Sequence, residues 1–537
     1  MTTETLRELP IGIQSFEKLR ERELLYVDKT QYIVPLLRGG GIYFLSRPRR
    51  FGKSLFLSTL QAYFEGNKAL FAGLSLEQAE PALAALEKRE AWQKYPILYL
   101  DLNSESYRTT EDLVKILNRH LRDWEGLYGE GDEDDSLSGR FEGIIKRAYQ
   151  KTGQQVVFLV DEYDKPLLES VVNKELYETY RSMLYGLYSN IKSCDRYLRF
   201  VFLTGVSRFG KLTIFSGLNN LNDISMDTAY AGICGIKEEE LVSYFVPEIA
   251  ELLATLQLTH EDTIAQLKQR YDGYQFCRYG EHVYNPFSLL NVLKKHEFAD
   301  YWYATGTPDF LVKYLKEAHY FIPDLEGDVR LDDYGLDKHR ADAHDPIPIL
   351  FQTGYLTIKE YVTARNYYRL GYPNDEVRYG FLNNLKSSFL PLDRGLGISI
   401  FKFLDDIDTQ DVDSFMERLQ TVFAHLPYDT TERTEIKFRE RDYQIVVYLV
   451  FALLGQYTAT EVVGTTGRAD CIVITATTVY IFEFKLWSAG SAEEALQQII
   501  DKGYAAKYAS SGKEIILVGA SFDEEKRNIK EWVIQRR

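Results

Sequence analysis

The first 236 residues alternate short apolar runs with stretches of helical periodicity. The runs lie at 42–46, 95–103, 155–163 and 199–207. They are apolar on both faces and separated by amphipathic segments, a pattern typical of buried strands in a parallel sheet covered by helices. Ligands of such sheets bind at the carboxyl ends of the strands. All four runs carry polar residues at that end: Ser46, Asp101, Asp161 with Glu162, and Thr204.

The pattern changes twice further along the chain. Helical stretches such as 238–244 and 261–271, with aromatic connectors, predict a helical or mixed middle domain. Strand patterns return at 469–475, 479–485 and 514–522, with a helical pattern over 492–508. We therefore expect an α/β protein of three domains. Its predicted parts are a helix-covered parallel sheet (1–236), a helical or mixed domain (237–429) and a small α/β domain (430–537).

Composition narrows the class of protein. The 537 residues carry a net charge of −16, so any contact with nucleic acid is expected through a local patch rather than the whole surface. The four cysteines form no CxxC pair, which argues against a disulfide framework and a cysteine zinc site. The sequence has neither a signal-peptide pattern nor an apolar run of about 18 residues that could span a membrane. We expect a soluble, cytoplasmic protein.

The first apolar run leads directly into RPRRFGKS, residues 47–54, and then into a helical pattern. A loop between strand and helix can wrap phosphates with its N–H groups, and a lysine can reach the terminal phosphates. The sequence thus predicts a Walker A P-loop for ATP. Arg47 stands where the first glycine usually lies, and a basic surface loop is the alternative. The residues expected to contact the nucleotide are Arg49, Arg50, Phe51, Gly52, Lys53 and Ser54, with Ser54 also a Mg²⁺ ligand.

The run at 155–163 ends in Asp161 and Glu162, which is the pattern of a Walker B strand. Asp161 is the expected second Mg²⁺ ligand, and Glu162 is the expected catalytic residue that polarises the attacking water. Thr204 and Arg208 are candidates for contact with the terminal phosphate. For these two, the alternative of an ordinary polar residue at a strand end weighs equally.

A second candidate site lies in the predicted hairpin of the last domain. A turn centred between Ala476 and Thr477 pairs residues whose numbers sum to 953, which sets Asp470 opposite Glu483, with Lys485 on the same face. Two adjacent carboxylates repel each other unless a divalent cation neutralises them. The triad therefore predicts a Mg²⁺ site, with Asp470 and Glu483 as ligands and Lys485 orienting water for phosphodiester hydrolysis. A cross-strand salt-bridge cluster is the alternative.

Longer motifs identify a family. LPIGIQSFEKLRERELLYVDKT, SRPRRFGKSLFLSTL, VDEYDKP, TGVSRFGK, YDGYQF and FQTGYLTI occur in that order within residues 5–380 and closely resemble the bacterial AAA-ATPase-like family. The family's own P-loop looks like RPRRFGKS, which accounts for Arg47. The resemblance implies a P-loop ATPase of the class with an additional strand in its sheet.

The last domain resembles the PD-(D/E)xK nuclease-like domain that commonly follows this ATPase. The motifs TTGRAD, FEFKL, AEEALQQI and GYAAKY carry the resemblance over residues 430–530. It implies that Asp470, Glu483 and Lys485 form the core motif and that Mn²⁺ can replace Mg²⁺ there. It also implies that Gln498 and Tyr504 belong to the following helix and that Glu440 is an upstream helical acid.

The combined expectation is an ATP-binding and ATP-hydrolysing protein whose nucleotide regulates a metal-dependent nuclease. The expected partner is nucleic acid, with DNA favoured over RNA. A nucleotide-dependent switch, whose nuclease-like domain serves only as a binding module, is the alternative. A remodelling ATPase that acts on protein partners is a third and less supported hypothesis. The sequence leaves the oligomeric state open, and a homo-oligomer remains among the options.

Overall fold

A computed structural model gives the fold as two compact units. It describes residues 8–39, 41–103, 106–131, 136–171, 173–208, 214–215, 218, 220–305, 311–312, 314–315, 318, 320–326, 329–336, 345–389, 399–426, 440–455, 459–462 and 470–537. One unit comprises Met1–Gly306 and Gly327–Glu376, and the other Thr307–Glu326 and Val377–Arg537. These units do not follow the boundaries expected at residues 237 and 430, and the division into three domains stays a prediction.

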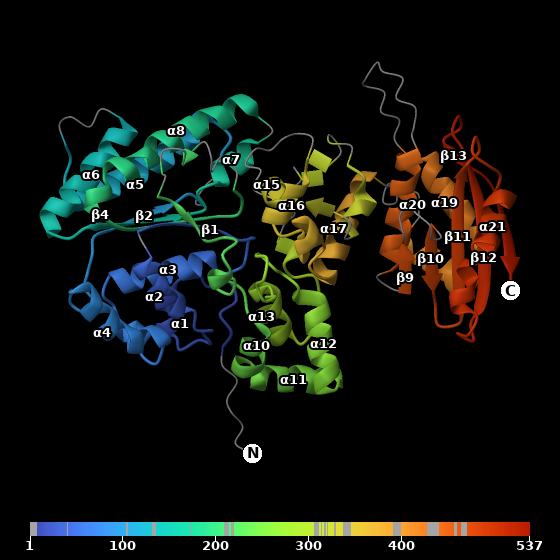
Figure 1. Cartoon of the computed structure of the whole chain (residues 1–537), viewed down its shortest axis with the longest axis horizontal. Helices are drawn as coiled ribbons and strands as arrows, with labels where there is room; N and C mark the ends of the chain where they lie inside the picture. The colour runs from blue at the N-terminus through green and yellow to red at the C-terminus, as the bar shows by residue number, and fades with distance from the viewer. Residues whose placement is uncertain are drawn as a thin grey trace. The chain divides into compact units, whose positions relative to one another are not determined.

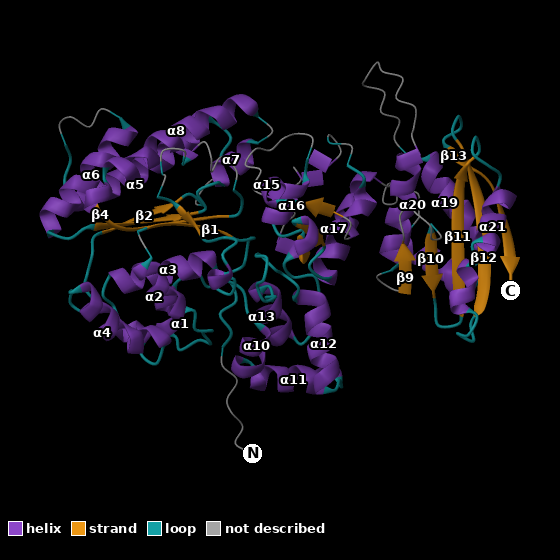
Figure 2. Ribbon diagram, viewed as in Figure 1, coloured by secondary structure: helices purple, strands orange, loops and turns teal. Residues whose placement is uncertain are grey.

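The first unit contains the expected parallel sheet, with strand order β2-β3-β4-β1-β5 (Figure 2). Its strands are β1 Ile42–Ser46, β2 Ile97–Asp101, β3 Val156–Asp161, β4 Leu198–Gly205 and β5 Asn222–Asp223. β4 lies between β1 and β3, as expected for a sheet with an additional strand. β1 and β3 are buried along their whole length, which explains their continuous apolar sequences.

Helices cover both faces of this sheet (Figure 1). On one face lie α1 Phe16–Glu21, α2 Ile33–Arg38, α3 Lys53–Phe64 and α4 Ser75–Glu87. On the other lie α5 Thr110–Tyr128, α6 Leu137–Thr152, α7 Lys165–Ser170 and α8 Lys174–Ser193. Thr109 and Asp112 form a capping box that fixes the start of α5. The strands and these helices therefore enclose a core, which includes Phe141, Phe158 and Leu184.

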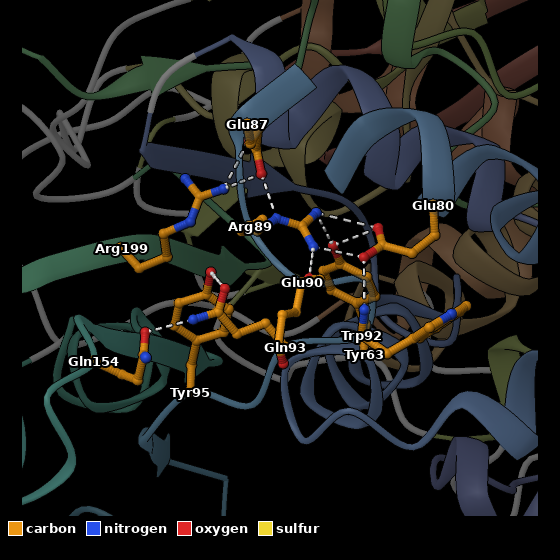
Figure 3. Close-up of polar contacts among 10 residues, drawn as sticks. All are labelled: Tyr63, Glu80, Glu87, Arg89, Glu90, Trp92, Gln93, Tyr95, Gln154 and Arg199. Atoms are coloured by element: carbon orange, nitrogen blue, oxygen red, sulfur yellow. Dashed lines mark hydrogen bonds and ion pairs between the residues drawn. The ribbon is translucent and has the colours of Figure 1, made fainter. Parts of the chain in front are cut away.

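A buried ion-pair network ties α4 to the sheet (Figure 3). Arg89 donates to Glu80 at 2.6 Å and to Glu87 at 2.6 Å, and Glu87 also binds Arg199 at the start of β4. The Glu80 side chain is fully buried. Its second oxygen accepts from Tyr63 of α3 at 2.9 Å. Each charge in this network thus has a partner, as burial requires.

The remainder of the first unit is mixed rather than purely helical. Its helices are α10 Glu238–Tyr244, α11 Val246–Leu256, α12 His260–Tyr271, α13 Pro286–Lys295, α15 Asp333–Leu336 and α16 Ile347–Gln352. A small antiparallel sheet, in the order β6-β8-β7, adds β6 Val329–Leu331, β7 Thr357–Val362 and β8 Tyr367–Gly371. The apolar pattern did not identify this sheet, because β7 is exposed at its middle residues.

The second unit is a mixed sheet packed with helices. The strand order is β13-β12-β11-β10-β9, and the strands are β9 Ala459–Val462, β10 Cys471–Ile474, β11 Thr478–Leu486, β12 Glu514–Asp523 and β13 Asn528–Arg536. The helices are α17 Asp375–Phe389, α18 Ile400–Asp408, α19 Val412–Ala424, α20 Glu440–Leu454 and α21 Ala492–Asp501. The helix expected over 492–508 is too long. α21 ends at Asp501 because Gly503 adopts a left-handed conformation, and a short 3₁₀ turn, Tyr504–Tyr508, follows.

Alternation along β11 gives its two faces different partners. Phe482 packs against Phe415 of α19 and Phe451 of α20. Val479 and Ile481, on the opposite face, pack in a core with Ile499 of α21. Glu483 and Lys485 continue this second face, which places both charged residues on the side of α21.

Candidate active sites

The P-loop runs from Ser46, the last residue of β1, to Lys53, the first residue of α3. Gly52 has φ of 95°, a left-handed conformation that favours glycine. No described atom lies within 4 Å of a Cβ built on Gly52, so backbone conformation rather than space requires this glycine. The loop therefore reaches the N-terminal end of a 12-residue helix, where the free N–H groups and the helix dipole favour an anion.

Lys53 is buried against this loop. Its Nζ donates to the carbonyl oxygens of Arg47 at 2.9 Å and of Pro48 at 3.1 Å. The ammonium group thus lies over the same turn of chain that would wrap a phosphate. Ser54 follows in the first turn of α3 and is partly exposed. The lysine and the hydroxyl fit the β- and γ-phosphates and their Mg²⁺ ion.

Arg47 explains how this loop dispenses with its first glycine. The side chain is 1% exposed and leaves the loop for the protein interior. Its guanidinium donates to the carbonyl oxygens of Ser225 at 2.7 Å and Tyr230 at 3.2 Å, and lies 4.4 Å from the ring centre of Phe276. Burial lowers the pKa of Arg47 to about 10. The residue therefore anchors the loop, and its side chain does not occupy the space over the turn.

The three residues before Gly52 differ in what they present. Phe51 is buried and packs edge-to-face on Tyr274, at 4.7 Å between ring centres, so it offers the loop only its main chain. Arg50 is exposed and lies over the ring of Phe287 at 5.1 Å. Arg49 is partly buried, and its carbonyl oxygen accepts from the indole of Trp302 at 3.0 Å. Of the three side chains, those of Arg49 and Arg50 have the charge and exposure to meet a phosphate.

The acid pair lies at the carboxyl end of β3. Thr204 of neighbouring β4 donates to Asp161 Oδ1 at 2.7 Å, and the Thr204 hydroxyl also accepts from the Glu162 backbone N–H at 3.3 Å. Glu162 has a positive φ of 54°, and burial raises the pKa of its carboxyl group. The hydroxyl expected to contact the phosphate thus orients the two acids instead. It positions them and is not itself directed at a ligand.

Asp164 belongs to this region and was missed by sequence reasoning. Its buried carboxylate accepts from the N–H of Val206 at 3.1 Å and of Ser207 at 2.5 Å, and from the Ser207 hydroxyl at 2.6 Å. It therefore joins the segment after β3 to the segment after β4. A Cβ on Gly205 would lie 2.5 Å from the Tyr163 ring, so the glycine permits this close approach. The signal was available: an acid follows Asp161 by three residues within VDEYDKP.

Arg208 is buried and its neighbours are polar. Its backbone N–H donates to Gln352 Oε1 at 2.8 Å, and its Nε lies 3.7 Å from Asp223 Oδ2. The side chain thus has an acidic neighbour at β5, on the side of β1 away from β3. The expected role of Arg208 in sensing the terminal phosphate stays a prediction.

The second candidate site is built on the β10–β11 hairpin, whose predicted register is confirmed. Cys471 pairs with Phe482 and Ile474 with Val479, so paired numbers sum to 953. Asp470 comes immediately before β10 and accepts from the Phe484 N–H at 2.8 Å through Oδ2. Glu483 and Asp470 are therefore neighbours at the end of the hairpin.

Glu483 is the most unusual group of this site. It is 5% exposed, and burial, followed by the charge of Asp470, raises the pKa of its carboxyl group to about 7. Gln498 of α21 donates to Oε1. Oε2 is buried and accepts no hydrogen bond from the described part of the chain. A buried carboxylate oxygen without a partner beside a second carboxylate fits a divalent cation, because hard cations take oxygen ligands.

The remaining predicted residues surround this pair unevenly. Lys485 is partly buried and its charge favours the ionised form of Glu483. Tyr504, after α21, contacts Gln498, and burial raises the pKa of its hydroxyl group. Glu440 begins α20, and its side chain lies outside what the structure describes. Within the described ranges, no three His, Cys, Asp or Glu side chains converge as a metal-binding group.

Gly519 of β12 also shapes this site, although sequence reasoning passed over it. It pairs with Glu483 in the parallel β11–β12 ladder. A Cβ on Gly519 would lie 2.3 Å from the Ala492 carbonyl oxygen and 2.5 Å from the Leu496 N–H nitrogen. The glycine therefore lets α21 approach the sheet closely enough to deliver Gln498 to Glu483. A glycine inside the apolar run of ILVGASF was the available signal.

Comparison with known proteins agrees with the two halves of this architecture. The model of a predicted AAA-ATPase family matches residues 10–215, and the model of the PD-(D/E)XK nuclease superfamily matches residues 438–532. An uncharacterized protein encoded in the vnfD 5′ region of Azotobacter chroococcum mcd 1 is 38% identical over 533 residues, which are 98% of this chain and 99% of the relative. In the described part of the chain, no helix is both long and apolar enough to cross a membrane. The chain belongs to the family of predicted AAA-ATPases that carry a C-terminal domain of the PD-(D/E)XK nuclease superfamily.

Proposed function

We propose that this protein binds and hydrolyses ATP and cleaves nucleic acid, preferably DNA, under control of the nucleotide. The observation that carries the nuclease half is the buried Glu483 carboxylate, whose Oε2 has no partner in the described chain, beside Asp470. A protein rarely retains such a pair on a buried face without a ligand that neutralises it. The family relationship supports both halves of the proposal.

In the ATPase half, the N–H groups of residues 49–54 and the Lys53 ammonium group bind the phosphates. Ser54 and Asp161 hold the Mg²⁺ ion of the nucleotide. Glu162 orients the attacking water and accepts its proton, which its raised pKa assists. Thr204 keeps Asp161 in place through its 2.7 Å hydrogen bond.

In the nuclease half, Asp470 and Glu483 hold a Mg²⁺ or Mn²⁺ ion. The ion, when bound, supplies positive charge that stabilises the pentavalent phosphorus of the transition state. Lys485 orients the attacking water and favours its deprotonation. Gln498 holds Glu483 through Oε1, which leaves Oε2 directed to the ligand. Glu440, at the start of α20, completes the acidic set.

The test is cleavage of plasmid and of single-stranded DNA by the full-length protein with Mg²⁺ and ATP. Asp470→Asn and Lys485→Ala remove the metal ligand and the cation, and both are expected to abolish cleavage while leaving ATP hydrolysis intact. Lys530→Ala, a lysine of β13 in the same unit that lies over the Trp487 ring, is the matched control. Equal activity of Lys485→Ala and wild type would refute the nuclease. Absence of cleavage together with loss of Mn²⁺ binding in Asp470→Asn would favour a metal-binding recognition module.

A further inference from the structure

A mostly apolar pocket adjoins the P-loop on one side. It has a volume of about 580 Å³, part of it open to solvent, which lies in the range of small-molecule sites. Gly52 and Leu55, at the start of α3, form one wall. Val27 and Lys29, from the segment between α1 and α2, form another, and Ile236, just before α10, forms a third.

The pocket lies on the side of the loop away from the acid pair. Its lining includes residues before β1, the loop and α3, and residues 233–290, but none from β3 or β4. Asp161, Glu162 and Thr204 belong to the ends of those two strands. A nucleotide whose terminal phosphate meets Asp161 and Glu162 therefore has its base at the opposite end of the loop, where Gly52 opens into the pocket.

Lys29 is the charged side chain of this lining. It is 8% exposed, and its Nζ donates to Glu240 Oε1 at 2.6 Å and Oε2 at 2.7 Å. Glu240 also accepts from the Lys237 N–H at 2.8 Å, so both of its oxygens are occupied. An ammonium group has three N–H donors, and the described chain engages two of them on Lys29. One N–H thus remains for a ligand inside a mostly apolar cavity.

This chemistry distinguishes the nucleobases. A flat aromatic ring fits the apolar walls, and a ring nitrogen accepts from Lys29. Guanine would bring N1–H and a 2-amino group to a cavity whose carboxylate, Glu240, is already saturated. Unpaired buried donors are costly, whereas adenine brings only its 6-amino group.

We propose that this pocket binds the adenine base and that Lys29 donates to a ring nitrogen of that base. The inference rests on the proposed function at the P-loop, because the triphosphate must lie there for the base to reach the pocket. It assigns a role to the sequence YVDKT, residues 26–30, which belongs to the segment that precedes the P-loop strand. The buried Lys29–Glu240 ion pair then links this segment to α10 around the base.

Calorimetric titration of the full-length protein with ATP, GTP, CTP and tripolyphosphate, each with Mg²⁺, tests the assignment. Tripolyphosphate engages the P-loop without a base. Wild type should bind ATP at least about tenfold more tightly than GTP or CTP. Val27→Trp and Leu55→Trp fill the pocket from two different walls, and each should weaken ATP about tenfold or more while changing tripolyphosphate less than about twofold. Leu86→Trp, at an exposed leucine of α4, is the matched control and should change neither.

Equal affinities for the three nucleotides, or equal losses of ATP and tripolyphosphate in both pocket variants, would overturn the assignment. Failure of the underlying function has a different signature. In that case tripolyphosphate does not bind to wild type, or its binding survives Lys53→Ala.

Discussion

The Trp302 indole N–H donates a 3.0 Å hydrogen bond to the carbonyl oxygen of Arg49 in the P-loop. The same residue donates its backbone N–H to Glu376 Oε1 at 2.6 Å, and Ser288 donates to Oε2 at 2.7 Å. Glu376 is the last residue of the first unit and lies in the first turn of α17, which continues into the second unit. Trp302 therefore joins the phosphate-binding loop to the helix that leads towards the nuclease domain.

Loss of this hydrogen bond should loosen the P-loop. Trp302→Phe keeps an aromatic ring against Tyr355 but removes the donor to Arg49, at a cost of about 1 kcal/mol. We expect the dissociation constant of ATP to rise about fivefold, as measured by calorimetry. Trp487→Phe, at the exposed tryptophan of the second unit, is the control and should leave ATP affinity unchanged. Unchanged affinity in Trp302→Phe would show that the bond does not shape the loop.

Glu376 predicts a pH dependence of the first unit's stability. Burial raises the pKa of Glu376 from 4.5 to about 7, so between these values the folded state binds more protons than the unfolded state. Stability from this group is therefore full below pH 4.5 and is lost as pH rises through 7. Glu376→Gln keeps the shape without the charge. The variant should be more thermostable than wild type at pH 8 and less so, or equal, at pH 5. Parallel melting curves from pH 5 to 8 would contradict the assignment.

The buried network around Arg89 should be sensitive to loss of one partner. Arg89→Met leaves the fully buried Glu80 without its cation, which typically costs 3–5 kcal/mol, or roughly that range here. We expect a large drop in the melting temperature of the first unit. The double variant Glu80→Gln, Arg89→Met should recover much of it, because no charge is then left unpaired. Thermal denaturation of both variants measures the difference, and equal melting temperatures would contradict the explanation.

Gly519→Ala should damage the nuclease site without touching a predicted ligand. The new methyl group would overlap the Ala492 carbonyl oxygen, so α21 must move, at a cost of about 1–3 kcal/mol. Gln498 would move with the helix, and Mn²⁺ affinity should fall although Asp470 and Glu483 remain. Gly186→Ala, in α8 with no described atom within 4 Å of its Cβ, is the control and should leave Mn²⁺ binding unchanged. Calorimetry with Mn²⁺ tests this, and wild-type affinity in Gly519→Ala would refute the role of close packing.

Sequence patterns predicted the features that depend on local order. The continuous apolar runs around β1 and β3 predicted a buried parallel sheet, and the period of two fixed the hairpin register that brings Asp470 next to Glu483. Both follow from the neighbours of each residue along the chain. The D-x₁₂-E-x-K spacing could thus be translated directly into a shared face.

The features that escaped prediction depend on partners far away in sequence. Arg47 binds carbonyl groups about 180 residues later, at Ser225 and Tyr230, and no spacing rule reports that distance. The same holds for Trp302, which meets Arg49 across 253 positions. Thr204 was expected to face a phosphate because it ends a strand. Its actual partner, Asp161, lies on the next strand, and strand order is set by tertiary packing.

The central claim is that ATP controls the nuclease. The most direct measurement is the initial rate of DNA cleavage by wild type and Lys53→Ala, each with Mg²⁺ and with or without ATP. The account predicts that ATP changes the wild-type rate severalfold, that Lys53→Ala cleaves at one rate regardless of ATP, and that both activities disappear with Lys485→Ala. A wild-type rate that is the same with and without ATP, while ATP is shown to bind, would contradict it.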